Sequence, residues 1–363
     1  MNVSSQTALA IAALAAALVV VIILLPPAAS TWSLNSANAA IVRAASLPSD
    51  ASARTSALGE ADAQLSQARA WSAYWRLALA RARLALARGE PQRAADVLAS
   101  VGTALSSDSI AQFVWADAAW QSQQPTVAYE HWRAAGALEY FTQQMHRARD
   151  SQQWKEAEDL ARIAIGIDPD LADAHHVLAD ALSHQAIDNP EALRELDRAA
   201  ALARDNELLS TVLSRKGEIL ASQGKWQDAL DVFAEAHRAA PIDARPRTGY
   251  ALTLLQLRPD ARDEAVALLT QVTTDSPWYS DAYIGLAQIA ESRGDVRGAE
   301  EWLQKGLARN PNNASVLFAL GKLYARQHRT DEARTALTLA LKYETRVEDR
   351  QAITRALAEL EAR

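Results

Sequence analysis

Apolar residues recur at helical spacing along most of this chain, and the pattern is clearest between residues 224 and 241. Ala229, Phe233 and Ala236 are separated by four and three positions, so they share one face of an α-helix. Pro241 stops the helix, because proline lacks a backbone N–H and clashes with the preceding turn. The stretch therefore predicts an amphipathic helix that ends before Pro241.

The same pattern returns at a nearly constant interval. Pro241, Pro277 and Pro311 are separated by 36 and 34 residues. Three further pairs of small or apolar residues, each 34 apart, are Ala299 and Ala333, Leu303 and Leu337, and Leu286 and Leu320. A fixed period of this length indicates a repeat array, in which each unit buries its apolar stripe against the next.

With a Leu-Gly pair, an aromatic residue, an alanine and a closing proline at this spacing, the unit resembles the tetratricopeptide repeat. The clearest copy comprises Leu317, Leu320, Gly321, Tyr324, Ala333, Leu337 and Ala340. The resemblance implies an all-α, right-handed solenoid of about eight helix-turn-helix units over residues 57–347. The expected units start near residues 75, 109, 138, 172, 210, 244, 280 and 314.

Both ends of the array depart from the repeat pattern. The first unit lacks the Leu-Gly pair, and its first helix is predicted to run from Ala57 to Arg88. At the other end, residues 348–363 combine charged residues with Ile353, Leu357 and Leu360 at helical spacing, which predicts a capping helix. Terminal repeats are commonly atypical because one of their faces meets solvent.

An uncharged apolar stretch from Ala8 to Leu25 precedes the array. As a helix it spans roughly 27 Å, close to the hydrocarbon thickness of a bilayer, about 30 Å. Residues 1–27 are therefore predicted to form a transmembrane anchor, with a cleaved signal peptide as the alternative. Residues 28–56, rich in Ala, Ser and Asn, are interpreted as a flexible linker. Together these features predict a single-pass plasma-membrane protein, with lipid contact through residues 8–25 and the repeats on the extracytoplasmic side.

Composition narrows the function classes. The chain of 363 residues has a net charge of −7, which argues against a general nucleic-acid binder. It has no cysteine, so disulfides and thiolate metal sites are excluded. It also lacks glycine-rich phosphate-binding motifs and the zinc motif H-E-x-x-H. We therefore expect no cofactor, no small-molecule substrate and no enzymatic activity.

Four polar residues form the first candidate site. In tetratricopeptide repeats, positions 2, 5, 9, 12 and 13 of the first helix tend to face a groove, and the resemblance places His146, His176, Asp180 and His184 there. A solvated polar groove is the favoured interpretation. A metal site and histidine-assisted binding of a partner are the alternatives. The neighbouring His175 takes a packing position.

Further groove positions complete the candidate partner-binding surface. Glu218 occupies position 9 of its unit, while Phe113 and Trp120 offer aromatic rings that an apolar peptide segment would contact. For the two rings, packing in the core is the favoured alternative. Position 9 is elsewhere occupied by Leu252, Gln288 and Lys322. Because none of these is asparagine, the carboxylate clamp found in some arrays of this family is not expected.

The resemblance and the apolar N-terminal stretch together predict a non-enzymatic, membrane-tethered scaffold that binds partner proteins. It would act as an adaptor or as an accessory subunit of a membrane complex. Two alternatives stay open. One is a regulatory or substrate-presenting module for a separate envelope enzyme, such as a glycan or polymer synthase. The other is an assembly chaperone in cytochrome maturation.

Overall fold

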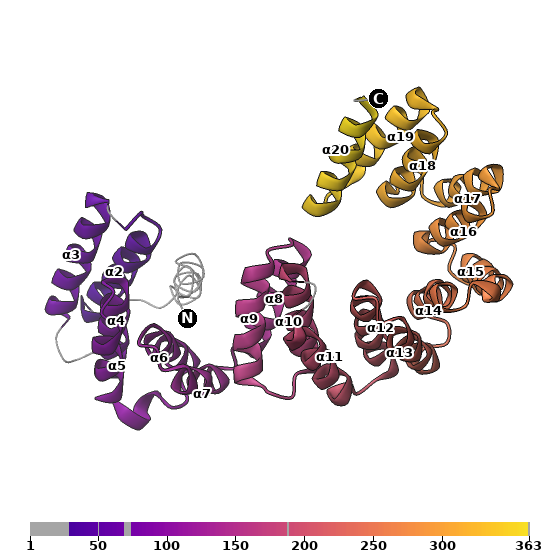
Figure 1. Cartoon of the computed structure of the whole chain (residues 1–363). Helices are drawn as coiled ribbons and strands as arrows, with labels where there is room; N and C mark the ends of the chain where they lie inside the picture. Colours follow the sequence, from indigo (N-terminus) through magenta and orange to yellow (C-terminus); the bar gives the residue numbers. More distant parts are fainter. Residues whose placement is uncertain (1–28, 50, 69–73, 187–188, 362–363) are drawn as a thin grey trace. The chain divides into compact units, whose positions relative to one another are not determined.

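The computed structural model describes residues 29–49, 51–68, 74–186 and 189–361 (Figure 1). All regular secondary structure in these ranges is helical, which confirms the all-α prediction. None of the helices in these ranges combines the length and the apolar character that a bilayer span requires. The predicted anchor at residues 8–25 lies outside the described ranges.

The chain divides into two compact units, the first ending at Val177 and the second beginning at Leu178. The helices of the first unit are α2 (Ala29–Ala45), α3 (Ser52–Gln67), α4 (Tyr74–Ala87), α5 (Pro91–Ala99), the short 3₁₀ helix η2 (Gly102–Leu105), α6 (Ser109–Gln121), α7 (Pro125–Ala135), α8 (Leu138–Asp150) and α9 (Trp154–Ile167). The division falls inside α10 (Ala172–Gln185).

The second unit continues with a longer series of helices. They are α11 (Pro190–Leu202), α12 (Asn206–Ser222), α13 (Trp226–Ala239), α14 (Ala244–Leu257), the 3₁₀ helix η3 (Pro259–Ala261), α15 (Arg262–Asp275), α16 (Ser280–Ser292), α17 (Val296–Arg309), α18 (Ala314–Arg326), α19 (Thr330–Tyr343) and α20 (Val347–Glu361). Within this unit each helix from α11 to α20 contacts the next one along the chain.

The predicted repeat frame agrees with the observed helices. Counting from α4, the first helices of successive pairs begin at residues 74, 109, 138, 172, 206, 244, 280 and 314. The largest difference is at α12, which begins four residues before the predicted start at 210. The Asp205 carboxylate accepts a hydrogen bond from the Leu208 backbone N–H at 2.8 Å, and this N-cap satisfies a donor at the helix start.

Helix α13, whose apolar face the sequence predicted, shows how a unit packs. Ala229, Phe233 and Ala236 on α13 are all buried, as their shared face predicted. The Phe233 ring lies against Gly217 on α12 and Gly249 on α14, where a Cβ atom would come within 2.8 Å and 2.3 Å of the ring. Only glycine leaves room for the aromatic ring between the two flanking helices.

The linker predicted for residues 28–56 is wrong where the structure describes it, because α2 and the start of α3 occupy most of that stretch. On α2, Leu34, Ala37 and Ile41 are buried in a cluster that also contains Leu65 of α3 and Leu77 of α4. Their spacing of three and four is a helical stripe. Its small alanines make the stretch resemble a linker in composition while they allow close helix packing.

The single helix predicted from Ala57 to Arg88 is also wrong. The structure has two helices there, since α3 ends at Gln67 and α4 begins at Tyr74. The two helices contact each other, and one straight helix could not make such a contact. No proline marks the break in the sequence, so local reasoning had no signal for it.

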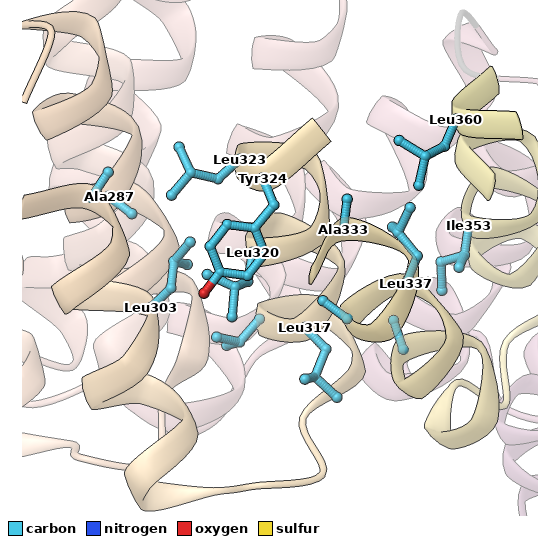
Figure 2. Close-up of a cluster of buried hydrophobic side chains, with 14 residues drawn as sticks. Ala287, Leu303, Leu317, Leu320, Leu323, Tyr324, Ala333, Leu337, Ile353 and Leu360 are labelled. Carbon is cyan, nitrogen blue, oxygen red and sulfur yellow. The ribbon is translucent and has the colours of Figure 1, made fainter. Parts of the chain in front are cut away.

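The helix α20 packs over the end of the second unit. Ile353 and Leu360 of α20 are buried in a cluster with Leu337 of α19 and Leu320 of α18 (Figure 2). Its remaining side chains are largely polar and exposed. The apolar side chains of α20 thus cover apolar surface of α18 and α19.

Candidate functional site

A cavity of about 610 Å³ lies within the second unit, lined by α16, α17, α18 and α20 together with the segment before α20. We call it the C-terminal groove. Its apolar lining includes Ile284, Ala287, Phe318, Ala319 and Ile353. Cavities of this size, with an apolar lining and a few polar groups, are typical of ligand-binding sites in proteins.

The polar side chains of the C-terminal groove are mostly paired with one another. Arg326 donates two hydrogen bonds to Glu291, at 2.6 and 2.7 Å. Arg346 forms ion pairs with Asp349 at 2.5 Å and with Glu344 at 3.4 Å. The buried Glu344 carboxylate also accepts backbone N–H donors from residues 345 and 346, at 3.0 and 2.9 Å. These charges are therefore neutralised within the protein.

Lys322 differs from these residues. It is exposed on the groove side of α18, and its Nζ lies 5.3 Å from the centre of the Phe318 ring. Among the described residues it has no carboxylate partner. The groove thus presents one unneutralised cation next to an aromatic ring, a combination that suits a ligand with both a carboxylate and an apolar group.

Several of the residues that line the C-terminal groove occupy the same first-helix positions, among 2, 5, 9, 12 and 13, that the sequence analysis used to select the other candidate residues. Positions 5, 9, 12 and 13 of the unit from 280 are Ile284, Gln288, Glu291 and Ser292, and all line the cavity. Positions 2, 5, 9 and 13 of the unit from 314 are Ser315, Phe318, Lys322 and Arg326, which also line it. Sequence reasoning named Gln288 and Lys322 only as position-9 residues and did not identify this surface as a site.

The two carboxylates proposed from sequence are engaged by arginines. Asp180 accepts a hydrogen bond from Arg215 Nε at 2.6 Å, and Arg215 Nη2 also donates to the Ser183 hydroxyl at 2.9 Å. Glu218 accepts from Arg215 Nη1 at 3.2 Å and lies 3.8 Å from Arg245 Nε. Burial opposes ionisation of Arg245, but the field of Glu218 and other nearby acidic groups outweighs it and raises the pKa of Arg245. These contacts link α10, α12 and α14.

The histidines proposed from sequence have different surroundings. His146 Nε2 lies 2.7 Å from Asp173 Oδ2. His176 is buried, whereas His184 is exposed. The part of the chain that the structure describes contains no group of three or more His, Cys, Asp or Glu residues arranged to bind a metal ion. His175 is buried, with Nε2 3.0 Å from the Pro169 carbonyl, as expected of a packing residue.

The aromatic candidates contact other rings of the first unit. Phe113 stacks on Phe141 and meets Tyr140 edge-on, with ring centroids 6.4 and 6.3 Å apart. The ring centroid of Trp120, on α6, lies 5.5 Å from that of the fully buried Trp132, on α7. Both rings are partly buried by these contacts, so the geometry favours packing over an open aromatic groove.

Sequence reasoning missed one residue of the first unit, Asp117. It occupies position 9 of the unit from 109, the register that drew attention to His146 and Asp180. Its side chain is only 3% exposed, and Oδ1 has no hydrogen-bond partner. Burial raises the pKa of Asp117 to about 8. Burial is also the main cause of the raised pKa of Tyr140, followed by the field of Asp117.

Comparisons with known proteins bear on the fold. Residues 260–316 and 294–360 match a family model described as tetratricopeptide repeat. A tetratricopeptide repeat protein from Parabacteroides merdae is 14% identical, with a TM-score of 0.52 over 79% of this chain and 99% of that one. This likeness shows that the tetratricopeptide fold extends over most of the chain.

Two further solved structures are similar over shorter stretches. The pilF protein of Pseudomonas aeruginosa is 19% identical, covering 61% of this chain and 97% of its own, with a TM-score of 0.44. TTC0263, a repeat protein of the same kind from Thermus thermophilus, is 20% identical, covering 52% and 99%, with a TM-score of 0.43. No curated protein sequence matches the chain significantly.

Proposed function

Residues 260–360 are tetratricopeptide repeats, which serve as scaffolds for protein–protein interaction, and from this premise we propose that the C-terminal groove binds a segment of a partner protein. The observation that carries the proposal is Lys322, an unneutralised cation beside the apolar lining of the groove. The role we propose is binding and not catalysis.

The groove favours a segment with an acidic and an apolar side chain close together. The apolar side chain would lie on Phe318 and Ile284, where burial of each CH₂ group contributes about 0.8 kcal/mol. The carboxylate would pair with Lys322. Because Arg326 and Arg346 already have carboxylate partners, binding at Lys322 would not break an ion pair within the protein.

The test is to select peptides from a random library on the purified full chain and measure their affinity by calorimetry. We expect selected peptides to be enriched in Asp or Glu next to a large apolar residue. Lys322→Met would weaken the binding of these peptides about 10- to 150-fold, which corresponds to about 1.5–3 kcal/mol for a hydrogen bond to a charged group.

Lys305→Met is the matched control. Lys305 Nζ also lies over an aromatic ring, 4.0 Å from the centre of the Trp302 ring, but Lys305 does not line the groove. We expect it to leave the affinity unchanged. Equal affinity of the selected peptides for the Lys322→Met chain and the unmodified chain would contradict the proposed site.

We further propose that residues 8–25 anchor the chain in a bilayer, with the repeats on the extracytoplasmic side. The support is the absence of any charge over 18 residues and a helical length that matches the hydrocarbon core. Since α2 begins at Ala29, only residues 26–28 lie between the anchor and the first packed helix. Three residues reach about 10 Å, so the first unit would lie close to the lipid headgroups.

Membrane attachment is tested by carbonate extraction of the full chain, and orientation by protease access to a C-terminal tag in intact cells. We expect resistance to extraction and cleavage of the tag from outside. Release by carbonate, or a mature N-terminus beyond residue 27, would favour a cleaved signal peptide.

A second experiment separates the scaffold from the alternative, a regulatory or substrate-presenting module for a separate enzyme. Residues 8–25 are replaced with an unrelated membrane helix. A scaffold would keep its partner binding, whereas a module that contacts its enzyme through the anchor would lose it.

A further inference from the structure

Two turns between repeats in the second unit carry large apolar side chains at their tips. Ile242 is 84% exposed and follows Pro241, and Trp278 is 74% exposed and follows Pro277. The corresponding tips after Pro169 and Pro311 carry Asp170 and Asn312. Polar residues of this kind are favoured in solvated turns. The two apolar tips are therefore a departure from the pattern of this chain itself.

The backbone of both turns is held in place by the protein. The buried Arg247 donates from Nη2 to the Ile242 carbonyl at 3.0 Å and from Nη1 to the Asp275 carboxylate at 2.7 Å. One guanidinium thus contacts the first turn and the helix end that leads into the second. The Tyr283 hydroxyl donates to the Pro277 carbonyl at 3.2 Å. These bonds place the turns side by side and fix the backbone that presents each tip.

The carboxylates nearest the tips are engaged within the protein. Asp243 accepts from the Arg245 backbone N–H at 3.0 Å and from the Ser210 hydroxyl at 3.1 Å. Asp275 is paired with Arg247, as described above. Neither tip residue is charged, so moving the tips out of water would not strand an unpaired charge at the tip itself.

We propose that Ile242 and Trp278 insert into the interfacial region of a lipid bilayer. The inference rests on the proposed function, in which residues 8–25 hold the chain at a membrane. Indole rings favour the boundary between headgroups and hydrocarbon. Because residues 8–25 would already hold the chain at the membrane, the effective concentration of lipid around the two side chains would be high, and their insertion would need little binding energy of its own.

The exposure of the two tips favours lipid over a protein partner. Residues that dominate protein interfaces usually lie in a packed patch whose rim excludes water. Ile242 and Trp278 stand almost free of their own surface, with polar or charged residues in the flanking sequence. Such protrusions need no complementary pocket when the surrounding phase is a fluid bilayer.

The absence of cysteine allows a direct test with one label per molecule. Ile242→Cys carries an environment-sensitive fluorophore in the full chain, reconstituted in phosphatidylcholine vesicles with or without lipids that carry a nitroxide near the headgroup. Asn312→Cys, at the same register on a polar tip, is the matched control. We expect the emission at 242 to be blue-shifted and quenched by the nitroxide lipids, and the emission at 312 to be neither.

A second variant tests the role of the indole. Trp278→Asn places at this tip the residue that the repeat carries at 312, so the fold accepts it. In the Ile242→Cys background we expect it to abolish both the blue shift and the quenching by nitroxide lipids. If both signals persist in this variant, the indole does not drive insertion and the proposal as stated is overturned.

The outcomes separate this inference from the anchor proposal. If the chain floats with vesicles but the label at 242 behaves like the label at 312, the tips do not insert while the anchor stands. If the chain does not float, the anchor proposal fails and this inference fails with it. A blue shift at 242 without quenching by nitroxide lipids would instead indicate a contact between proteins.

Discussion

Asp117→Asn should remove a strong pH dependence from the stability of the first unit. The Asp117 carboxyl is 3% exposed and its Oδ1 lacks a hydrogen-bond partner, so the folded state disfavours its charged form. Burial raises its pKa from 3.8 to about 8. Between these two values the folded protein holds a proton that the unfolded chain releases. Stability therefore falls as the pH rises through this window.

The magnitude follows from the size of the shift. Each pH unit inside the window costs 1.36 kcal/mol, so raising the pH from about 5 to about 7.5 is expected to reduce the free energy of unfolding by about 3 kcal/mol. The asparagine side chain has nearly the shape of a protonated aspartate and does not titrate. Asp117→Asn should therefore match the unmodified chain near pH 3, below the unfolded pKa, and exceed its stability by about 1.6 kcal/mol near pH 5 and by about 5 kcal/mol near pH 7.5.

The assay is urea unfolding of the full chain, followed by tryptophan fluorescence, with hydrogen exchange of the α6 amides as a local readout. Asp96→Asn is the matched control, because Asp96 is an exposed residue of α5 whose carboxylate accepts from Gln92 at 3.1 Å. It should keep the pH dependence of the unmodified chain. If Asp117→Asn also keeps it, the carboxyl is ionised in the folded state and the burial argument is refuted.

Two further changes test the packing and the polar contacts. Gly249→Ala places a Cβ against the Phe233 ring and should lower the free energy of unfolding by about 1–3 kcal/mol in urea. Gly59→Ala is the control, because a Cβ at Gly59 meets nothing within 4 Å, and it should raise the free energy of unfolding by about 0.5–1 kcal/mol. Equal effects of Gly249→Ala and Gly59→Ala would contradict the packing argument. Arg215→Met removes the arginine partner of the half-buried Asp180 and should speed amide exchange in α10 and α12. Adding Asp180→Asn should restore part of the protection, and no recovery would show that Arg215 acts through packing alone.

The paired carboxylates show why candidate sites were harder to predict than helices. Asp180 and Glu218 occupy groove positions by register, as the sequence indicated. Whether a groove carboxylate is available depends on the side chain that reaches it from the next repeat. In this chain Arg215 lies 35 residues after Asp180 and neutralises it. No local pattern encodes that contact, whereas Lys322 occupies the same register in a later repeat and has no such partner among the described residues.

What the sequence determined by itself was local and periodic. Prolines and apolar residues three and four apart act within one or two helical turns, so they placed the repeat units to within a few residues. What the tertiary structure decided depended on contacts between distant segments. Packing on α3 and α4 made residues 29–45 a helix where composition suggested a linker. Burial left Asp117 Oδ1 without a hydrogen-bond partner, and the approach of α16, α18 and α20 formed the groove around Lys322. Burial and charge pairing are sums over neighbours in space, and these neighbours are known only once the chain has folded.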